Sequence, residues 1–213
     1  MDMSFTKSFD HNEALYETAV AEFVAAGYEQ ASINTILKKA GMSKGQFYYH
    51  FKNKEELYLA ITNIMIERKK TFMASVMKPE DLQRDIFSIF KTQIEYGIEF
   101  AQMYPEINAF SDSFLKEKGN PIYETAMTRH NFENNDAFNM MIAVAYQKGD
   151  FREELPLSFV QKTIGYLFTH IQDFTDLTDA EGAQEQLNYL VDFMRKGLAR
   201  EPKPPRSENE SAS

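Results

Sequence analysis

Apolar residues recur at intervals of three and four along almost the whole chain, which is the spacing of an amphipathic helix. No segment alternates between apolar and polar residues with a period of two, and the sequence has no internal repeat. The pattern therefore predicts an all-α protein of about nine helices. The first helix follows Asp10, an N-cap residue with Glu13 at the capping-box position, and stops at Gly27. Its apolar face consists of Leu15, Ala19, Val20, Phe23 and Val24.

Residues 32–57 predict two short helices joined through a glycine, followed by the start of a longer helix. Ser32 is a suitable N-cap for the first of them, and Gly41 stands where this helix must end. Ser43 opens the second helix with Gln46 three residues later, which is the spacing of a capping box. Two short helices joined in this way form a helix-turn-helix, whose second helix can enter the major groove of DNA.

Residues 31–54 form a basic island in an acidic protein. The whole chain has a formal net charge of −9, whereas this stretch contains five lysines and no Asp or Glu. Affinity for DNA comes largely from neutralised phosphates, so a local positive charge favours DNA binding. A solvated lysine face on an ordinary helical hairpin would explain the charge, but it leaves the aromatic-rich segment QFYYHF unexplained. The lysines are Lys38, Lys39, Lys44, Lys52 and Lys54.

The segment AGMSKGQFYYHFKNKEEL, residues 40–57, resembles the DNA-binding signature of the TetR (tetracycline repressor-like) family. That signature reads roughly AG-V/M-S-x-G-x-F/L-Y-x-H/Y-F-x-x-K-E/D-x-L, and nearly every position it specifies is matched. The resemblance spans about residues 11–60, with Ser32 where Thr is common and Leu37 where Ala is common. It implies a DNA-binding domain whose first helix packs behind the helix-turn-helix and holds it.

The resemblance and the side-chain chemistry together indicate which residues contact DNA. Lys44 is the best candidate for binding guanine O6 and N7, followed by Gln46 and the ring of Tyr49. A helix C-cap is the structural alternative for His50, and Ser43 is a cap in either case. Tyr48 and His50 are expected to bond phosphates, as are Ser32, Thr35 and Lys54, and Gly45 would allow a close approach to the duplex. The full set is Ser32, Thr35, Ser43, Lys44, Gly45, Gln46, Tyr48, Tyr49, His50 and Lys54.

Changes of composition divide the chain into four predicted segments. Residues 1–9 are a flexible arm, residues 10–53 the helix-turn-helix domain, residues 54–200 a helical domain for ligand binding and dimerisation, and residues 201–213 a disordered tail rich in Pro, Ser and Glu. Asn53 caps a long helix over residues 54–76 that can join the two domains rigidly. Further helices are predicted over residues 82–104, 105–118, 122–147, 157–175 and 180–199.

The helical domain is dense in aromatic residues and methionines, which repack easily around varied ligands. The resemblance implies a pocket for a small effector in this region, with an apolar or aromatic effector favoured. Plain core is the alternative, and for any single residue it is the more frequent role. The candidate pocket residues are Phe87, Phe90, Phe100, Phe110, Phe114, Phe138, Met141 and Tyr166.

The last two predicted helices carry apolar residues on more than one face, as helices do that pack both on their own domain and on a partner. The resemblance implies that this pair forms a homodimer as a four-helix bundle. A two-fold dimer reads a palindromic operator, with half-sites about 34–36 Å apart or a multiple of that spacing. The candidate interface residues are Leu167, Ile171, Leu190, Phe193 and Met194.

Composition argues against several other classes of protein. The chain has no cysteine, its four histidines are scattered, and no glycine-rich phosphate loop is present, so we expect neither an enzyme nor a cofactor or metal site. No run approaches the roughly 20 apolar residues that cross a bilayer, and the first residues lack the apolar core of a signal peptide. We therefore expect a cytoplasmic protein, and the resemblance to the TetR family implies that it is a ligand-responsive repressor. The alternative is a helical adaptor that keeps the helix-turn-helix without binding a specific operator.

Overall fold

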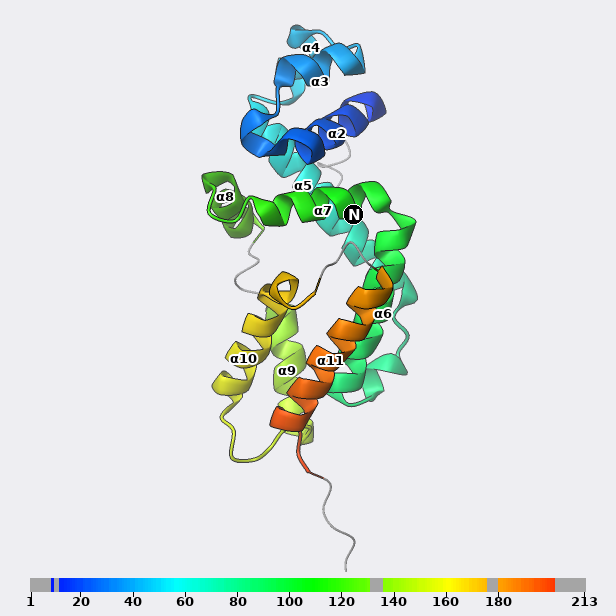
Figure 1. The fold of residues 1–213 in the computed structure, drawn as a ribbon, viewed down its shortest axis with the longest axis vertical. Coiled ribbons are helices and arrows are strands. Elements are labelled where there is room, and N and C mark those ends of the chain that lie inside the picture. The colour runs from blue at the N-terminus through cyan, green and yellow to red at the C-terminus, as the bar shows by residue number, and fades with distance from the viewer. Residues whose placement is uncertain (1–8, 10–11, 131–135, 176–179, 202–213) are drawn as a thin grey trace, which may run out of the picture. The chain divides into compact units, whose positions relative to one another are not determined.

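The computed structural model describes residues 9, 12–130, 136–175 and 180–201 (Figure 1). Within these residues the protein is helical and contains no β-strand, apart from one isolated antiparallel bridge between Phe151 and Ala199. None of the helices in this part is long and apolar enough to cross a membrane. The prediction of an all-α fold is therefore confirmed, with ten α-helices in the described part of the chain where about nine were expected.

The chain forms two compact units, Met1–Met77 with Glu95–Asn135 and Lys78–Ile94 with Asp136–Ser213. We call them the first and the second unit. The predicted domain boundary at residue 54 does not coincide with this division, because the first unit extends well beyond the helix-turn-helix. Helix α6, Ile86–Met103, contributes residues to both units. The functional boundary at residue 54 stays a prediction.

The first unit has one continuous apolar core. Its largest fully buried side chains include Phe23, Phe47, Tyr58 and Phe110, which come from four different helices. The ring of Tyr58 packs edge-on against Phe23 with centroids 4.9 Å apart. The helices of this unit, besides the second half of α6, are α2 (Glu13–Gln30), α3 (Ile33–Ala40), α4 (Lys44–His50), α5 (Lys54–Val76), α7 (Pro105–Lys116) and α8 (Pro121–Arg129).

The second unit packs its helices around the first half of α6. Phe87 of α6 contacts Phe151, and Phe90 contacts Phe168 with ring centroids 5.0 Å apart. An ion pair of 2.7 Å joins Lys91 of α6 to Asp192 of the last helix. The elements of this unit are two 3₁₀ turns, η1 (Asp81–Gln83) and η2 (Ile171–Asp173), and the helices α9 (Asp136–Lys148), α10 (Leu157–Thr169) and α11 (Ala180–Leu198).

Several predicted helix ends are confirmed and one predicted helix is wrong. Helix α5 covers Lys54–Val76 as expected, and Asn53 caps it by accepting a hydrogen bond from the Glu56 backbone N–H at 2.8 Å. The single helix predicted over residues 122–147 is instead two helices, because α8 ends at Arg129 and α9 begins at Asp136. The intervening sequence, HNFENN, contains three Asn, which is a poor helix former.

Four further predictions concern helix ends and the two termini of the chain. Asp10 and the tail after residue 201 lie outside the described residues. The helix predicted over residues 157–175 ends earlier, at Thr169, and continues as the 3₁₀ turn η2. Phe9, assigned to the flexible arm, packs against the rings of Tyr16 and Phe51 with centroids 5.7 and 5.2 Å apart. The apolar core of the first unit therefore extends to Phe9.

Candidate nucleic-acid interface

Helix α4 is held on the protein by two phenylalanines one turn apart. Phe47 and Phe51 are both buried, and their rings stack with centroids 5.7 Å apart. They join the apolar residues of α2 and α3 in the core of the first unit. Since residues four apart lie on one face of a helix, the side chains between them are directed elsewhere. Helix α4 is thereby divided into a core face and a free face.

Capping interactions between residues close in sequence define where α3 and α4 begin and where α3 ends. The Ser32 hydroxyl accepts a hydrogen bond from the Thr35 backbone N–H at 3.4 Å at the start of α3. Gly41 ends α3 with a φ of 65°, a left-handed conformation that glycine adopts without strain. At the start of α4, Ser43 and Gln46 form the predicted capping box, with bonds of 3.3 and 2.9 Å. The helix-turn-helix geometry is therefore built by residues within fifteen positions of one another.

The free face of α4 combines a lysine, two tyrosines and a glycine. Tyr49 is 86% exposed and Tyr48 is 57% exposed, while Lys44 and Gly45 are also exposed. His50 is half-buried, its ring edge-on to that of Tyr49 with centroids 5.1 Å apart. The helix C-cap is Phe51, so the alternative role of His50 as the cap is wrong. Exposing an aromatic ring to water is unfavourable unless a partner covers it. The exposed rings therefore give this face the character of a binding surface.

Gln46 is less free than the sequence suggested. Its amide oxygen accepts hydrogen bonds from both the backbone N–H and the hydroxyl of Ser43, each at 2.9 Å. Reading adenine requires the amide oxygen and nitrogen together. In this structure only the amide nitrogen of Gln46 remains available for a base.

Lys54 has partners inside the protein. Its Nζ donates to the carbonyl oxygens of Tyr28, Glu29 and Ala31 at 2.7, 2.9 and 3.2 Å. An ammonium has three donors, so these bonds use all of them. In this structure Lys54 thus caps the end of α2, and its role as a phosphate contact stays a prediction. A basic residue at the C-terminal end of a helix also interacts favourably with the helix dipole.

The other lysines of the basic island differ in their ion pairs. Lys39 pairs with Glu22 at 3.2 Å, and Lys52 pairs with Glu56 at 3.6 Å. The backbone N–H of Lys52 also donates to Glu56 and, with the charge of this lysine, holds the pKa of the Glu56 carboxyl below its usual value. Lys44 has no ion-pair partner among the described residues. It is therefore the cation of α4 that is available to a ligand.

The candidate pocket residues lie in different cores. Phe100, Phe110 and Phe114 are buried in the first unit, where Phe110 and Phe114 pack against Tyr58. Phe87, Phe90, Phe138 and Met141 belong to the second unit. Tyr166 is 62% exposed and stacks on His170, so its assignment to an enclosed pocket is wrong. An aromatic residue at helical spacing does not by itself reveal which core it joins.

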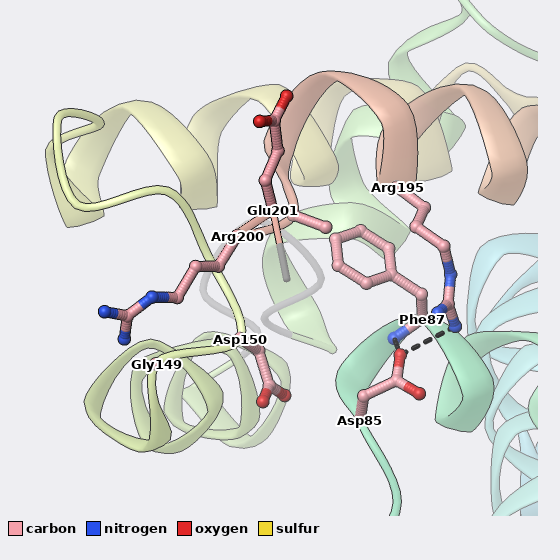
Figure 2. A pocket seen from close by; sticks show the side chains of 8 residues that line it. Asp85, Phe87, Gly149, Asp150, Arg195, Arg200 and Glu201 are labelled. Carbon is pink, nitrogen blue, oxygen red and sulfur yellow. Dashed lines mark hydrogen bonds and ion pairs between the residues drawn. The ribbon is translucent and has the colours of Figure 1, made fainter. Parts of the chain in front are cut away.

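Two hollows open on the second unit. Figure 2 shows the larger, about 440 Å³, where Arg195 donates to Asp85 at 2.7 Å. Burial alone would raise the pKa of the Asp85 carboxyl, but hydrogen bonds from Ser88 and the charge of Arg195 outweigh it and lower this pKa. The charged side chains of Asp85 and Arg195 are thus paired with each other. Among the candidate pocket residues, Phe87 lines this hollow and Met141 lines a second one of about 300 Å³.

The candidate dimer residues divide into buried and exposed ones. Leu190 and Met194 of α11 are 8% and 1% exposed, so both belong to the core of their own unit and their assignment to an interface is wrong. Phe193 is 68% exposed, and Leu167 and Ile171 are half-buried. The predicted interface did not include the exposed aromatic residues Phe159 of α10 and Tyr189 of α11. Both residues are visible in the sequence as aromatic residues of a helix, but periodicity cannot tell which of two apolar faces is exposed.

Known proteins resemble this chain in the helix-turn-helix and in the fold. Residues 15–61 match the family of bacterial regulatory proteins called the tetR family. The chain is 29% identical over 111 residues to the HTH-type transcriptional regulator YhgD of Bacillus subtilis, and the match covers 49% of this chain and 58% of YhgD, less than two thirds of that relative. It is 22% identical over 195 residues to the HTH-type transcriptional repressor AcnR of Corynebacterium efficiens, covering 91% of this chain and 95% of AcnR. A TetR family transcriptional regulator from Chloroflexus aurantiacus has a similar fold, with a TM-score of 0.66 and 20% identity over 90% of this chain and 94% of that one.

Proposed function

Because the chain belongs to the TetR family of bacterial regulatory proteins, we propose that it is a repressor that binds a palindromic operator as a homodimer and is released by a small effector. The observation that carries this proposal is the free face of α4, where Lys44, Tyr48 and Tyr49 are exposed on a helix anchored by two buried phenylalanines. A short helix that is rigidly held and free on one side can enter the major groove.

The free face of α4 divides its contacts between bases and phosphates. Lys44 is at the first position of the helix, where its ammonium would reach guanine O6 and N7. Tyr48 and His50 would bond phosphates and set the register of the helix on the duplex. Gly45 supports the same arrangement, since a side chain there would meet no atom closer than the Ser43 hydroxyl at 4.0 Å. The glycine is not required by packing within the protein, and close approach to DNA explains it.

We further propose that the exposed aromatic residues of α10 and α11 form the dimer interface. Tyr189 and Phe193 lie one turn apart on α11, and Phe159 and Tyr166 lie two turns apart on α10, so each helix has an exposed apolar stripe. A two-fold axis would bring each stripe against the same stripe of a second copy. This replaces Leu190 and Met194 in the predicted interface and keeps Phe193.

An effector would release the operator by favouring a conformation in which the two copies of α4 no longer match successive major grooves. The required difference in affinity between the two conformations is about 1–3 kcal/mol. Phe87, Phe90, Phe138 and Met141 of the second unit support an apolar or aromatic effector, since they combine aromatic rings with a flexible thioether.

Mobility shift on the DNA upstream of the protein's own gene tests the proposal. At near-physiological salt and with excess competitor DNA, a repressor gives a discrete complex with one dimer per site. Specific binding is typically about 10³–10⁷ times tighter than non-specific binding. Binding that appears only at low salt and without preference, on this DNA and on a random pool, would instead favour a helical adaptor that keeps the helix-turn-helix fold. No turnover of bound small molecules is expected in either case.

A further inference from the structure

The end of helix α2 is an unusual joint in the first unit. Gly27 has a φ of 69° and a ψ of 170°, which interrupts the regular helix four residues before Ala31. The backbone groups of the following turn therefore need partners outside the helix. Two other parts of the first unit supply these partners. One binds the backbone N–H of Tyr28, and the other binds the carbonyl oxygen of the same residue.

The first partner is Lys54, which begins α5 four residues after α4 ends at His50. Its ammonium donates to the carbonyl oxygens of Tyr28, Glu29 and Ala31 and lies 4.7 Å from the centroid of the Tyr28 ring. The C-terminal side of the helix-turn-helix is thus attached to the end of α2 by one side chain.

The second partner is the corner between α7 and α8. Glu117, the residue that ends α7, accepts a hydrogen bond of 2.6 Å from the backbone N–H of Tyr28. The amide of Asn120 donates to the other oxygen of Glu117 at 3.1 Å and to Glu29 at 3.2 Å, which orients the Glu117 carboxylate. One helical turn earlier, the hydroxyl of Ser113 donates to the Phe23 carbonyl of α2 at 3.2 Å.

The fit of Glu117 against Gly27 is close. A Cβ atom at position 27 would lie 3.1 Å from the Glu117 carboxylate, and the positive φ already favours glycine there. A charged acceptor on a backbone N–H makes a short, directional bond, whereas apolar contacts between helices tolerate sliding. The position of α2 along α7 is therefore defined by this bond and not by apolar packing alone.

We propose that Glu117 is a positioning residue for operator binding, because it transmits the position of the α7–α8 corner through Tyr28 and Lys54 to the recognition helix α4. The inference rests on the proposed function as a dimeric regulator. A shift of the corner moves the N–H of Tyr28, the carbonyl of the same residue moves with it, and Lys54 follows. Loss of the bond leaves the fold and the free face of α4 intact but allows α4 a wider range of positions.

The dependence of operator affinity on the spacing between half-sites reports how widely α4 can move. In a dimer, two rigidly held helices bind only half-sites at one separation, so operators with one or two base pairs inserted at the centre are bound weakly. A loosely held helix tolerates the inserted base pairs. Glu117→Asp retains the charge but is one methylene shorter, so its carboxylate no longer reaches the Tyr28 N–H. Glu117→Gln retains the reach and an acceptor oxygen.

The test begins with operators selected from a random DNA pool by the wild-type protein, from which variants with altered central spacing are made. We expect the wild type and Glu117→Gln to lose about tenfold or more in affinity for the altered spacings. For Glu117→Asp the loss in affinity between the selected operator and the altered spacings should be only about threefold or less. Circular dichroism and the affinity for random DNA should be the same for all three proteins. Glu117→Gln already controls for the loss of charge, and Glu124→Ala, at an exposed residue of α8, controls for a change near the corner that leaves the bond between Glu117 and Tyr28 intact.

The outcomes separate the two proposals. If the wild type enriches no sequence, the proposed function fails whatever Glu117 does. If the wild type enriches an operator but either lacks a spacing preference or shares it fully with Glu117→Asp, the role of Glu117 is refuted while the regulator stands. A loss of spacing preference in Glu124→Ala as well would attribute the effect to any change near the corner, and not to the bond between Glu117 and Tyr28, and would also refute the role of Glu117.

Discussion

The free face of α4 and the outer face of α11 both expose aromatic rings, but in opposite electrostatic surroundings. On α4, Tyr48 and Tyr49 lie in a stretch of lysines without any acidic residue between positions 31 and 54. On α11, the hydroxyl of Tyr189 donates to the Glu185 carboxylate at 2.6 Å, and this bond raises the pKa of Tyr189. A phosphate would be attracted to the first face and repelled from the second.

The comparison shows that the charges beside an exposed ring distinguish a nucleic-acid surface from a protein surface. Exposed tyrosines suit both kinds of partner, because the ring is apolar and the hydroxyl forms hydrogen bonds. The neighbouring side chains decide between them. Four substitutions test this contrast and the packing behind it.

Phe193→Asp should abolish dimer formation and lower operator affinity by about 10²–10⁴-fold, since both half-sites must then be bound by separate chains. The buried carboxylate would have no partner in the apolar interface. Sedimentation gives the oligomeric state and mobility shift the affinity. The matched control is Gln147→Asp, which adds the same charge at an exposed position of α9. Persistence of the dimer in Phe193→Asp would place the interface elsewhere.

Lys44→Ala should relax the preference for the operator over operators with substituted guanines by about 1–3 kcal/mol, because a bidentate contact to guanine is lost. Binding to random DNA should weaken only slightly. Competition assays with single-base variants measure the discrimination. Lys116→Ala, at an exposed residue of α7, removes the same charge away from α4 and should leave discrimination unchanged. Equal discrimination by Lys44→Ala and the wild type would remove Lys44 from base recognition.

Asp85→Asn should destabilise the second unit by about 1 kcal/mol, the usual effect of losing a helix cap and a half-exposed ion pair. Asp85 accepts from the backbone N–H groups of Phe87 and Ser88 and pairs with Arg195. Its pKa is lowered in the folded protein, so its contribution is present above its ordinary pKa of 3.8 and is lost as pH falls through the folded value. Urea unfolding between pH 3 and 7 should show this loss in the wild type and not in Asp85→Asn.

Tyr58→Phe should change stability by less than about 1 kcal/mol, in either direction. The Tyr58 hydroxyl is buried without a hydrogen-bond partner among the described residues, and burial raises its pKa. By contrast, the side chain of Tyr48 is accessible to solvent, and the hydroxyl of Tyr189 donates a hydrogen bond to Glu185. A loss of several kcal/mol on thermal unfolding would indicate a partner for this hydroxyl.

Local sequence signals predicted the helix-turn-helix well. Ser43 and Gln46 form the expected capping box, and Gly41 ends α3 in the left-handed conformation. Each of these features involves residues within a few positions of each other, so the chemistry of the cap determines the structure. The core face of α4 followed from the four-residue spacing of Phe47 and Phe51 for the same reason.

Contacts between distant residues could not be predicted in this way. Lys54 looked like a phosphate contact because its partners, the carbonyls at the end of α2, lie 23 to 26 positions away. Glu117 bonds Tyr28 across 89 positions, and nothing in its neighbourhood marks it. Leu190 and Phe193 both fit an apolar stripe, but only packing in the second unit shows that the first is buried and the second exposed. The sequence therefore predicts helix caps formed by neighbouring residues, whereas the long-range partners of Lys54 and Glu117 can be seen only in the tertiary fold.

A photoreactive benzophenone residue at position 49 or at position 189 tests most directly that α4 meets DNA and α11 meets a second copy of the chain. Both wild-type tyrosines are exposed, at 86% and 62%, so the substitution is tolerable at either site. We expect crosslinks to operator DNA from position 49 and protein–protein crosslinks from position 189, and an excess of wild-type protein without the benzophenone should reduce both. DNA crosslinks from position 189, or none from position 49 in a specific complex, would contradict it.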